Sequence, residues 1–155
     1  MTFKNTMSTS ISTLVLLFSI VFINTVHAAN PVYSGGRERA AIRGYDTVSY
    51  FTEGKPVKGL AEYTDTHKGA KWLFSSEKNL KLFKQNPEKY TPQYGGYCAY
   101  AVSKGSTASI KPEYFTIHKN KLYLNYSKSV FNKWGKDKDN YIEDANREWP
   151  DLIDR

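Results

Sequence analysis

The chain has a single cysteine, Cys98, and this feature constrains its fold more than any other. One thiol cannot form an internal disulfide, and it excludes the CxxC pairs of redox proteins and zinc ribbons. Stability must therefore come from the packing of side chains. The 155 residues include 12 tyrosines, 8 phenylalanines and 3 tryptophans, so the predicted core is aromatic. Its hydroxyl and indole N–H groups need hydrogen-bond partners.

The N-terminal segment, residues 1–28, has the pattern of a secretory signal peptide. Lys4 is its one charged residue, an apolar run covers residues 14–23, and small residues end it at Ala28. The run is too short for a permanent transmembrane anchor, and no lipobox cysteine lies near Ala28. We therefore expect cleavage near Ala28 and export to the periplasm or the medium. The remaining residues suffice for one domain, preceded by a lead-in segment over residues 29–43.

Two β-hairpins dominate the pattern of residues 44–150. Period-2 segments flank a polar turn at residues 67–70, and similar segments flank a second turn at residues 118–121. The predicted fold class is α+β: a single domain in which a small antiparallel sheet of two hairpins packs with three to four short helices. The sequence shows no internal repeat and no linker that would separate domains.

Three helices are expected, one after the first hairpin and two after the second. The first covers residues 77–85 and is capped by Ser75 or Ser76. The second covers residues 128–134. The third covers residues 139–149, and the proline that follows is expected to end it.

The formal net charge is +7 at pH 7, but the lysines are spread from Lys55 to Lys138 with acidic residues between them. Such a surface is mostly solvated charge, with only weak, salt-sensitive attraction to anionic polymers or lipid surfaces. Nucleic acid is not an expected partner of an exported protein. The sequence identifies no protein partner.

Several motifs follow one another in a fixed order along the chain. They lie at residues 44–51, 67–76, 83–90 and 92–99, and the last of these reads Pro-Gln-Tyr-Gly-Gly-Tyr-Cys-Ala. On these motifs the chain resembles the YHS domain proteins, specifically their secreted single-domain branch, and residues 121–126 also resemble that branch. The resemblance covers nearly all of residues 44–149. It implies a small domain associated with metals, since related domains accompany copper-transporting ATPases, mercury-handling proteins and some hydroxylases.

The metal ligands that this resemblance implies are only partly present. In the metal-associated relatives the aromatic strand ends in Phe-Cys-Ser, and a second cysteine follows on the helix. In this chain Ser75 and Asn79 hold those two positions, and an early cysteine of such relatives has no counterpart after Asp46. A thiolate-rich site for copper(I) or zinc therefore does not carry over.

Three residues of ligand type remain within the motifs: Asp46, His67 and Cys98. A Cys-His-carboxylate set could hold a transition metal ion such as copper, zinc or iron and leave one position open. Each residue also has a structural interpretation. Asp46 could cap backbone N–H groups at a turn, His67 could be solvated or could cap its hairpin turn, and Cys98 could be a small buried hydrophobe.

Two aromatic residues are candidates for lining a small-molecule site. Tyr94 and Tyr97 lie in the glycine-rich motif with Cys98, and together with Asp46 they could bind a flat or aromatic ligand. Strand alternation would instead place some of these rings in the core.

Three functions follow as hypotheses. The leading one is an exported binding module that holds a metal ion or a small ligand around Asp46, His67 and Cys98, with Tyr94 and Tyr97 as walls. The second is a thiol- or metal-dependent redox enzyme, which requires an exposed and activated Cys98 sulfur. The third is a structural or protein-interaction domain without a bound cofactor.

Overall fold

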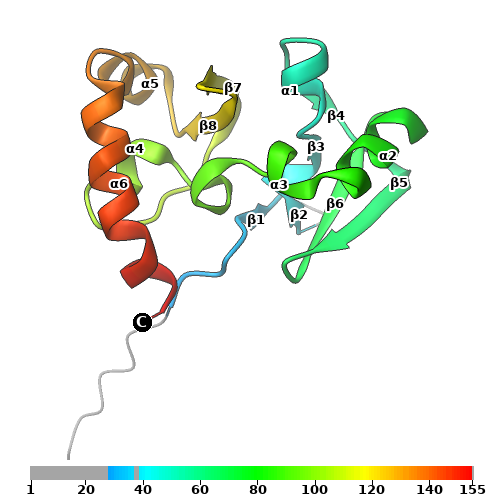
Figure 1. Cartoon of the computed structure of the whole chain (residues 1–155), viewed down its shortest axis with the longest axis horizontal. Coiled ribbons are helices and arrows are strands. Elements are labelled where there is room, and N and C mark those ends of the chain that lie inside the picture. Colours follow the sequence, from blue (N-terminus) through cyan, green and yellow to red (C-terminus); the bar gives the residue numbers. More distant parts are fainter. Residues whose placement is uncertain (1–27, 37–38, 155) are drawn as a thin grey trace, which may run out of the picture.

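The computed structural model describes residues 28–36 and 39–154. Within these residues it contains six α-helices and four antiparallel two-stranded sheets, which confirms the predicted α+β class (Figure 1). Of the predicted signal peptide only Ala28 is described, so that prediction falls almost wholly outside the described residues. None of the described helices is both long enough and apolar enough to cross a membrane.

The first half of the fold is built around a long hairpin. Strands β5 (Leu60–His67) and β6 (Ala70–Phe74) pair antiparallel, and β6 is followed by helix α2 (Glu77–Gln85). This helix begins after Ser76, whose side chain accepts a hydrogen bond from a backbone N–H of the first turn. An N-cap of this kind contributes about 1 kcal/mol. The shorter elements of this half are β1 (Ser34–Gly35), β2 (Ala40–Ala41), η1 (Ile42–Gly44), β3 (Tyr45–Asp46), α1 (Ser49–Thr52), β4 (Val57–Lys58) and α3 (Pro87–Tyr90).

The second half is built around a second hairpin of the same kind. Strands β7 (Lys111–His118) and β8 (Lys121–Asn125) pair antiparallel, and helix α5 (Lys128–Gly135) follows. Ser127 caps this helix as Ser76 caps α2. The other elements of this half are η2 (Gln93–Gly96), α4 (Ala99–Val102) and α6 (Lys138–Ile153).

The two hairpins are equivalent in length and register. In each, a strand of 8 residues pairs with a strand of 5 residues. The register shifts at the same place, between Leu60 and Thr64 in the first hairpin and between Lys111 and Phe115 in the second. The structure is thus an internal repeat, which corrects the expectation of none. The sequence retains part of this repeat, since six residues of the first unit recur 51 positions later: Glu62, Tyr63, His67, Lys68, Leu73 and Ser76 correspond to Glu113, Tyr114, His118, Lys119, Leu124 and Ser127.

Each half also contains the same unusual turn ahead of its hairpin, and we call these the first turn and the second turn. The first turn, residues 42–44, has φ angles of 52°, 59° and 76°, and the second turn, residues 94–96, has φ angles of 56°, 58° and 85°. Positive φ is unfavourable for residues with a Cβ atom. Ile42, Arg43 and Tyr94 nevertheless adopt it. Asp46 follows the first turn by two residues, and Cys98 follows the second turn by two residues.

The core consists of two hydrophobic clusters, and the larger one holds the halves together. The larger one draws on both halves, since Trp72 and Phe74 of β6 share it with Leu122 and Leu124 of β8. The smaller one joins the second turn to α4 and to α6, which covers the outer side of the second half (Figure 1). Trp134 and Ala145 are buried in this smaller cluster.

The helix boundaries agree with the expectations at two places and differ at a third. Helices α2 and α5 cover the expected segments, and three helices of four residues, α1, α3 and α4, join them. Helix α6 does not end at Pro150 but continues to Ile153. The last turn is retained because Leu152 is buried and its carbonyl accepts a hydrogen bond from the backbone N–H of Ala29 at 2.8 Å.

Candidate functional site

Asp46 is a fully buried carboxylate that receives hydrogen bonds on both oxygens. Oδ1 accepts from the backbone N–H of Val48 at 2.9 Å and more weakly from that of Ser49 at 3.4 Å. Oδ2 accepts from Ser75 N at 2.8 Å, Ser75 Oγ at 2.6 Å and Asn79 Nδ2 at 2.7 Å. We call Asp46, Ser75 and Asn79 the carboxylate cluster. It joins the turn before α1 to the end of β6 and the start of α2.

Two members of the carboxylate cluster, Ser75 and Asn79, hold the positions at which the resemblance to metal-associated relatives implies cysteines. Ser75 and Asn79 both direct hydrogens at Asp46, so the lone pairs that a metal would use already accept hydrogen bonds from the protein. A serine hydroxyl and an amide are also poor ligands for a soft metal ion. The residues present therefore do not fit the thiolate site of those relatives, and the arrangement is the capping one expected of Asp46 in its structural interpretation.

His67 lies at the end of β5, against the aromatic core of the first half. Its ring centroid is 5.7 Å from that of Phe83 and 6.4 Å from that of Trp72. Its Nε2 atom lies 3.4 Å from Oε1 of Glu88, and its backbone carbonyl accepts a hydrogen bond from Trp72 Nε1 at 3.0 Å. The side chain is thus part of the packing and faces one carboxylate.

Cys98 lies in the second half and is 1% exposed. Its backbone N–H donates to the carbonyl of Ala108 at 3.1 Å, and the residue forms a parallel β-bridge with Leu124. Its thiol contacts Oδ1 of Asn125 at 3.6 Å. Asn125 is itself fully buried, and its Nδ2 atom has no hydrogen-bond partner among the described residues.

The three residues predicted as metal ligands are not brought together. Asp46 is bound within the carboxylate cluster, His67 faces Glu88, and Cys98 faces Asn125. Across residues 28–36 and 39–154 no group of three or more His, Cys, Asp and Glu side chains is placed to hold a metal ion. The three residues lie within the sequence motifs but do not share a site. Each side chain is oriented by its own element toward a different partner.

Burial of Cys98 leads to a direct prediction about its reactivity. In the native protein we expect labelling by a disulfide reagent such as Ellman's reagent to be at least about 100-fold slower than in guanidinium chloride, because reaction requires an opening of the fold. The absorbance released over time measures this rate. Equal rates in the two conditions would show an accessible thiol and would revive the hypothesis of a thiol-dependent redox enzyme.

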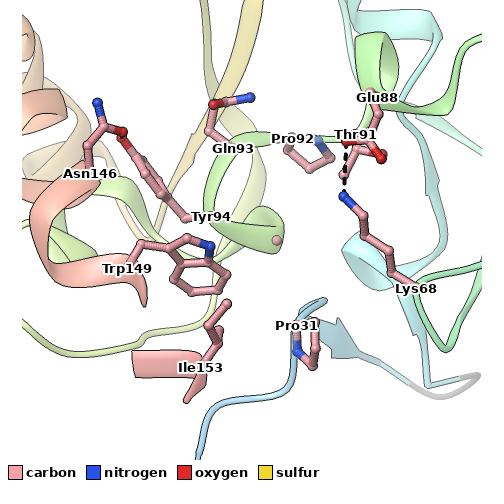
Figure 2. Close-up of a pocket in the computed structure, with 11 residues that line it drawn as sticks. Pro31, Lys68, Glu88, Thr91, Pro92, Gln93, Tyr94, Asn146, Trp149 and Ile153 are labelled. Carbon is pink, nitrogen blue, oxygen red and sulfur yellow. Dashed lines mark hydrogen bonds and ion pairs between the residues drawn. The ribbon is translucent and has the colours of Figure 1, made fainter. Parts of the chain in front are cut away.

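A cavity of about 390 Å³ lies beside the second turn, and we call it the seam cavity. Figure 2 shows Tyr94, Trp149 and Ile153 on one side of it and Lys68 with Glu88 on the other. Tyr94 and Gly95 come from the second turn, Lys68 from the hairpin turn of the first half, and Trp149 from α6. The remaining lining residues are Pro31, Thr91, Pro92, Gln93 and Asn146.

The side chains of the seam cavity are held by specific contacts. The Tyr94 hydroxyl donates to Asn146 Oδ1 at 3.0 Å, and burial raises the pKa of this phenol. The Trp149 ring packs on Tyr94 with a centroid distance of 6.1 Å and on Tyr97 with one of 6.0 Å. Tyr97 thus lies behind Trp149 rather than in the lining, and its pKa is also raised by burial.

The opposite wall of the seam cavity carries an ion pair. Lys68 Nζ donates to Glu88 Oε2 at 3.0 Å, and this hydrogen bond is the main reason that the pKa of Glu88 is lowered. Of the residues predicted to bind a ligand, only Tyr94 lines this cavity. Trp149 and Asn146 could not be found by motif, because α6 brings them to the cavity from a distant part of the chain.

Comparison with known families gives one match. The model of the YHS domain matches residues 48–94, which run from the residue before α1 through the first hairpin, α2 and α3 to Tyr94 in the second turn. No curated protein and no solved structure gives a significant match to the chain. The matched stretch contains His67, Ser75 and Asn79, and it ends before Cys98. The chain therefore carries a YHS domain at residues 48–94.

Proposed function

We propose that the protein is an exported binding module that holds a small organic molecule in the seam cavity. The observation that carries this proposal is the cavity itself, in which an aromatic wall faces an ion pair. Small-molecule sites combine a mostly apolar lining with a few polar groups that fix orientation. Export rests on the N-terminal pattern of residues 1–28.

The apolar side of the cavity indicates the body of the ligand. Trp149 and Ile153 of α6 line it together with Pro31 of the N-terminal segment. Trp149 is supported from behind by Tyr97, so its ring offers a fixed face for an aromatic or aliphatic group. This wall would contribute most of the binding energy through apolar surface removed from water.

The polar side indicates the end groups of the ligand. Lys68 and Glu88 neutralise one another, so the wall has a dipole and little net charge. Asn146 adds an amide, whose oxygen already accepts from Tyr94. A molecule that carries both an ammonium and a carboxylate group, such as an apolar amino acid, would complement such a wall better than a simple anion or cation.

The test is a binding titration of the purified protein with L-phenylalanine, benzoate and benzylamine, followed by tryptophan fluorescence and by the melting temperature. We expect the zwitterion to bind more tightly than the two singly charged probes. Trp149→Ala should weaken its binding by about tenfold or more. Tyr126→Ala, which removes an aromatic ring that is 51% exposed, is the matched control and should bind like the wild type.

Two results would overturn the proposal. The first is the absence of saturable binding of all three probes up to about 10 mM, a range that includes even weak ligands. The second is equal binding by the wild type and Trp149→Ala. Addition of copper, zinc or iron in parallel separates the metal hypothesis, since a bound metal would raise the melting temperature of both proteins alike.

A further inference from the structure

A second cavity, of about 710 Å³, lies beside the first turn. Arg43 and Gly44 of the first turn line it, as Tyr94 and Gly95 of the second turn line the seam cavity. One cavity therefore lies beside each of the two turns. We call this second one the basic cavity, because its lining includes Arg43, Lys58 and Lys111 and only one acidic residue, Glu113.

The positive charge of the basic cavity is held in place by neutral groups. Lys58 Nζ donates to the carbonyl oxygen of Arg43 at 2.8 Å and lies 4.5 Å from the ring centroid of Tyr45. Arg43 Nη1 donates to the carbonyl oxygen of Ile110 at 3.2 Å. Neither contact cancels a charge, and in the described part of the chain no carboxylate forms a salt bridge with either side chain.

These contacts leave donors available. A guanidinium group has five N–H donors and an ammonium group has three, so each side chain retains several after its one carbonyl contact. Lys111 approaches from β7, so the three cations come from three separate elements. Cations fixed by carbonyl contacts lose less conformational entropy on binding an anion than mobile surface lysines do.

The backbone at this place is also strained. Ile42 is β-branched and buried, and it adopts a φ of 52°, while Arg43 follows with a φ of 59°. Each residue held in a sparsely populated φ/ψ region destabilises the folded state by about 1–3 kcal/mol, and such residues occur often at ligand sites. The strained conformation places the Arg43 side chain on the cavity wall while its carbonyl oxygen holds Lys58.

We propose that the basic cavity is a second binding site, and that it takes a small soluble anion bearing phosphate or carboxylate oxygens. Arg43 would bind two oxygens of such a group through its planar fork, and Lys58 and Lys111 would supply the remaining charge. This site is independent of the seam cavity, since the two cavities share no lining residue.

The test uses inorganic phosphate and citrate, titrated at constant ionic strength and followed by ¹H–¹⁵N NMR of the whole purified protein. We expect saturable shifts around the first turn. Lys111→Gln and Arg43→Asn should each weaken binding by about fivefold or more, because each removes one cation. Asparagine tolerates positive φ, so the second variant keeps the turn conformation. Lys84→Gln, an exposed lysine on α2, is the control of equal charge change and should bind like the wild type.

Three outcomes would overturn this inference. They are a lack of saturable shifts up to about 10 mM anion, an equal loss of binding in Lys84→Gln, and binding to phosphatidylglycerol vesicles without binding to free phosphate. The last would show a lipid surface as the source of the anion instead of a small soluble molecule. Because the probes of the seam cavity are followed through Trp149, failure of either site can be distinguished from failure of the other.

Discussion

Replacing Asp46 with alanine is expected to lower the free energy of unfolding by about 4 kcal/mol or more. The carboxylate is fully buried, and its removal leaves the N–H of Val48, the N–H of Ser75 and the amide of Asn79 without their acceptor. A buried donor without a partner costs about 1–3 kcal/mol. The loss also separates the end of β6 from the turn before α1.

Denaturant unfolding followed by circular dichroism measures this change. Asp151→Ala on the exposed side of α6 is the control, and it should stay within about 0.5 kcal/mol of the wild type. Asp46→Asn keeps the shape of the side chain but turns one acceptor into a donor. Its loss of unfolding free energy should therefore lie between those of Asp46→Ala and Asp151→Ala. A loss below about 1 kcal/mol for Asp46→Ala would mean that the carboxylate cluster does not hold the first half together.

Substitution of Gly95 by alanine is expected to cost about 3 kcal/mol or more. Gly95 has a φ of 58°, and a Cβ atom there would overlap the carbonyl oxygen of Pro31 and lie 2.9 Å from its carbonyl carbon. Backbone atoms cannot move aside as a side chain can, so the second turn would have to open. The hydrogen bond from Tyr33 N to the Gly95 carbonyl, at 2.9 Å, would weaken with it.

Gly69→Ala provides the matched comparison. Gly69 has a φ of 74° in the hairpin turn, and nothing lies within 4 Å of an added Cβ atom. Gly69→Ala therefore lowers the free energy of unfolding only through the positive φ, by about 1 kcal/mol, because no atoms overlap. Thermal melts of the two variants separate the effects. Equal melting temperatures would show that Pro31 does not restrain the second turn.

Much of the fold could be predicted from local sequence patterns. The two hairpins follow from period-2 segments around polar turns, and α2 follows from Ser76 and the apolar residues after it. Those signals act within a few residues, so no tertiary information is needed. The internal repeat was missed although the Glu-Tyr and His-Lys pairs at residues 62–63 and 67–68 recur at residues 113–114 and 118–119. These few identities are accompanied by unlike pairs such as Asp46 and Cys98, and the repeat is complete only in backbone angles and strand register.

The candidate site was harder to predict for the opposite reason. Asp46, His67 and Cys98 share motifs, but the direction of each side chain depends on packing between elements that are distant in sequence. The wall of the seam cavity is formed in the same way, since Trp149 reaches Tyr94 only through the docking of α6. A single sequence contains the local preferences of α6 but not its place on the second half.

The shared larger hydrophobic cluster limits what can be cut from this chain. Residues 48–94, the stretch that matches the YHS domain, contribute Trp72 and Phe74 to that cluster, but Leu122 and Leu124 belong to the other half. A truncated protein ending at residue 94 would expose the face that these two leucines cover, so it would lose cooperative folding rather than survive as a smaller domain. The two copies of this hairpin–helix architecture therefore form a single folding unit.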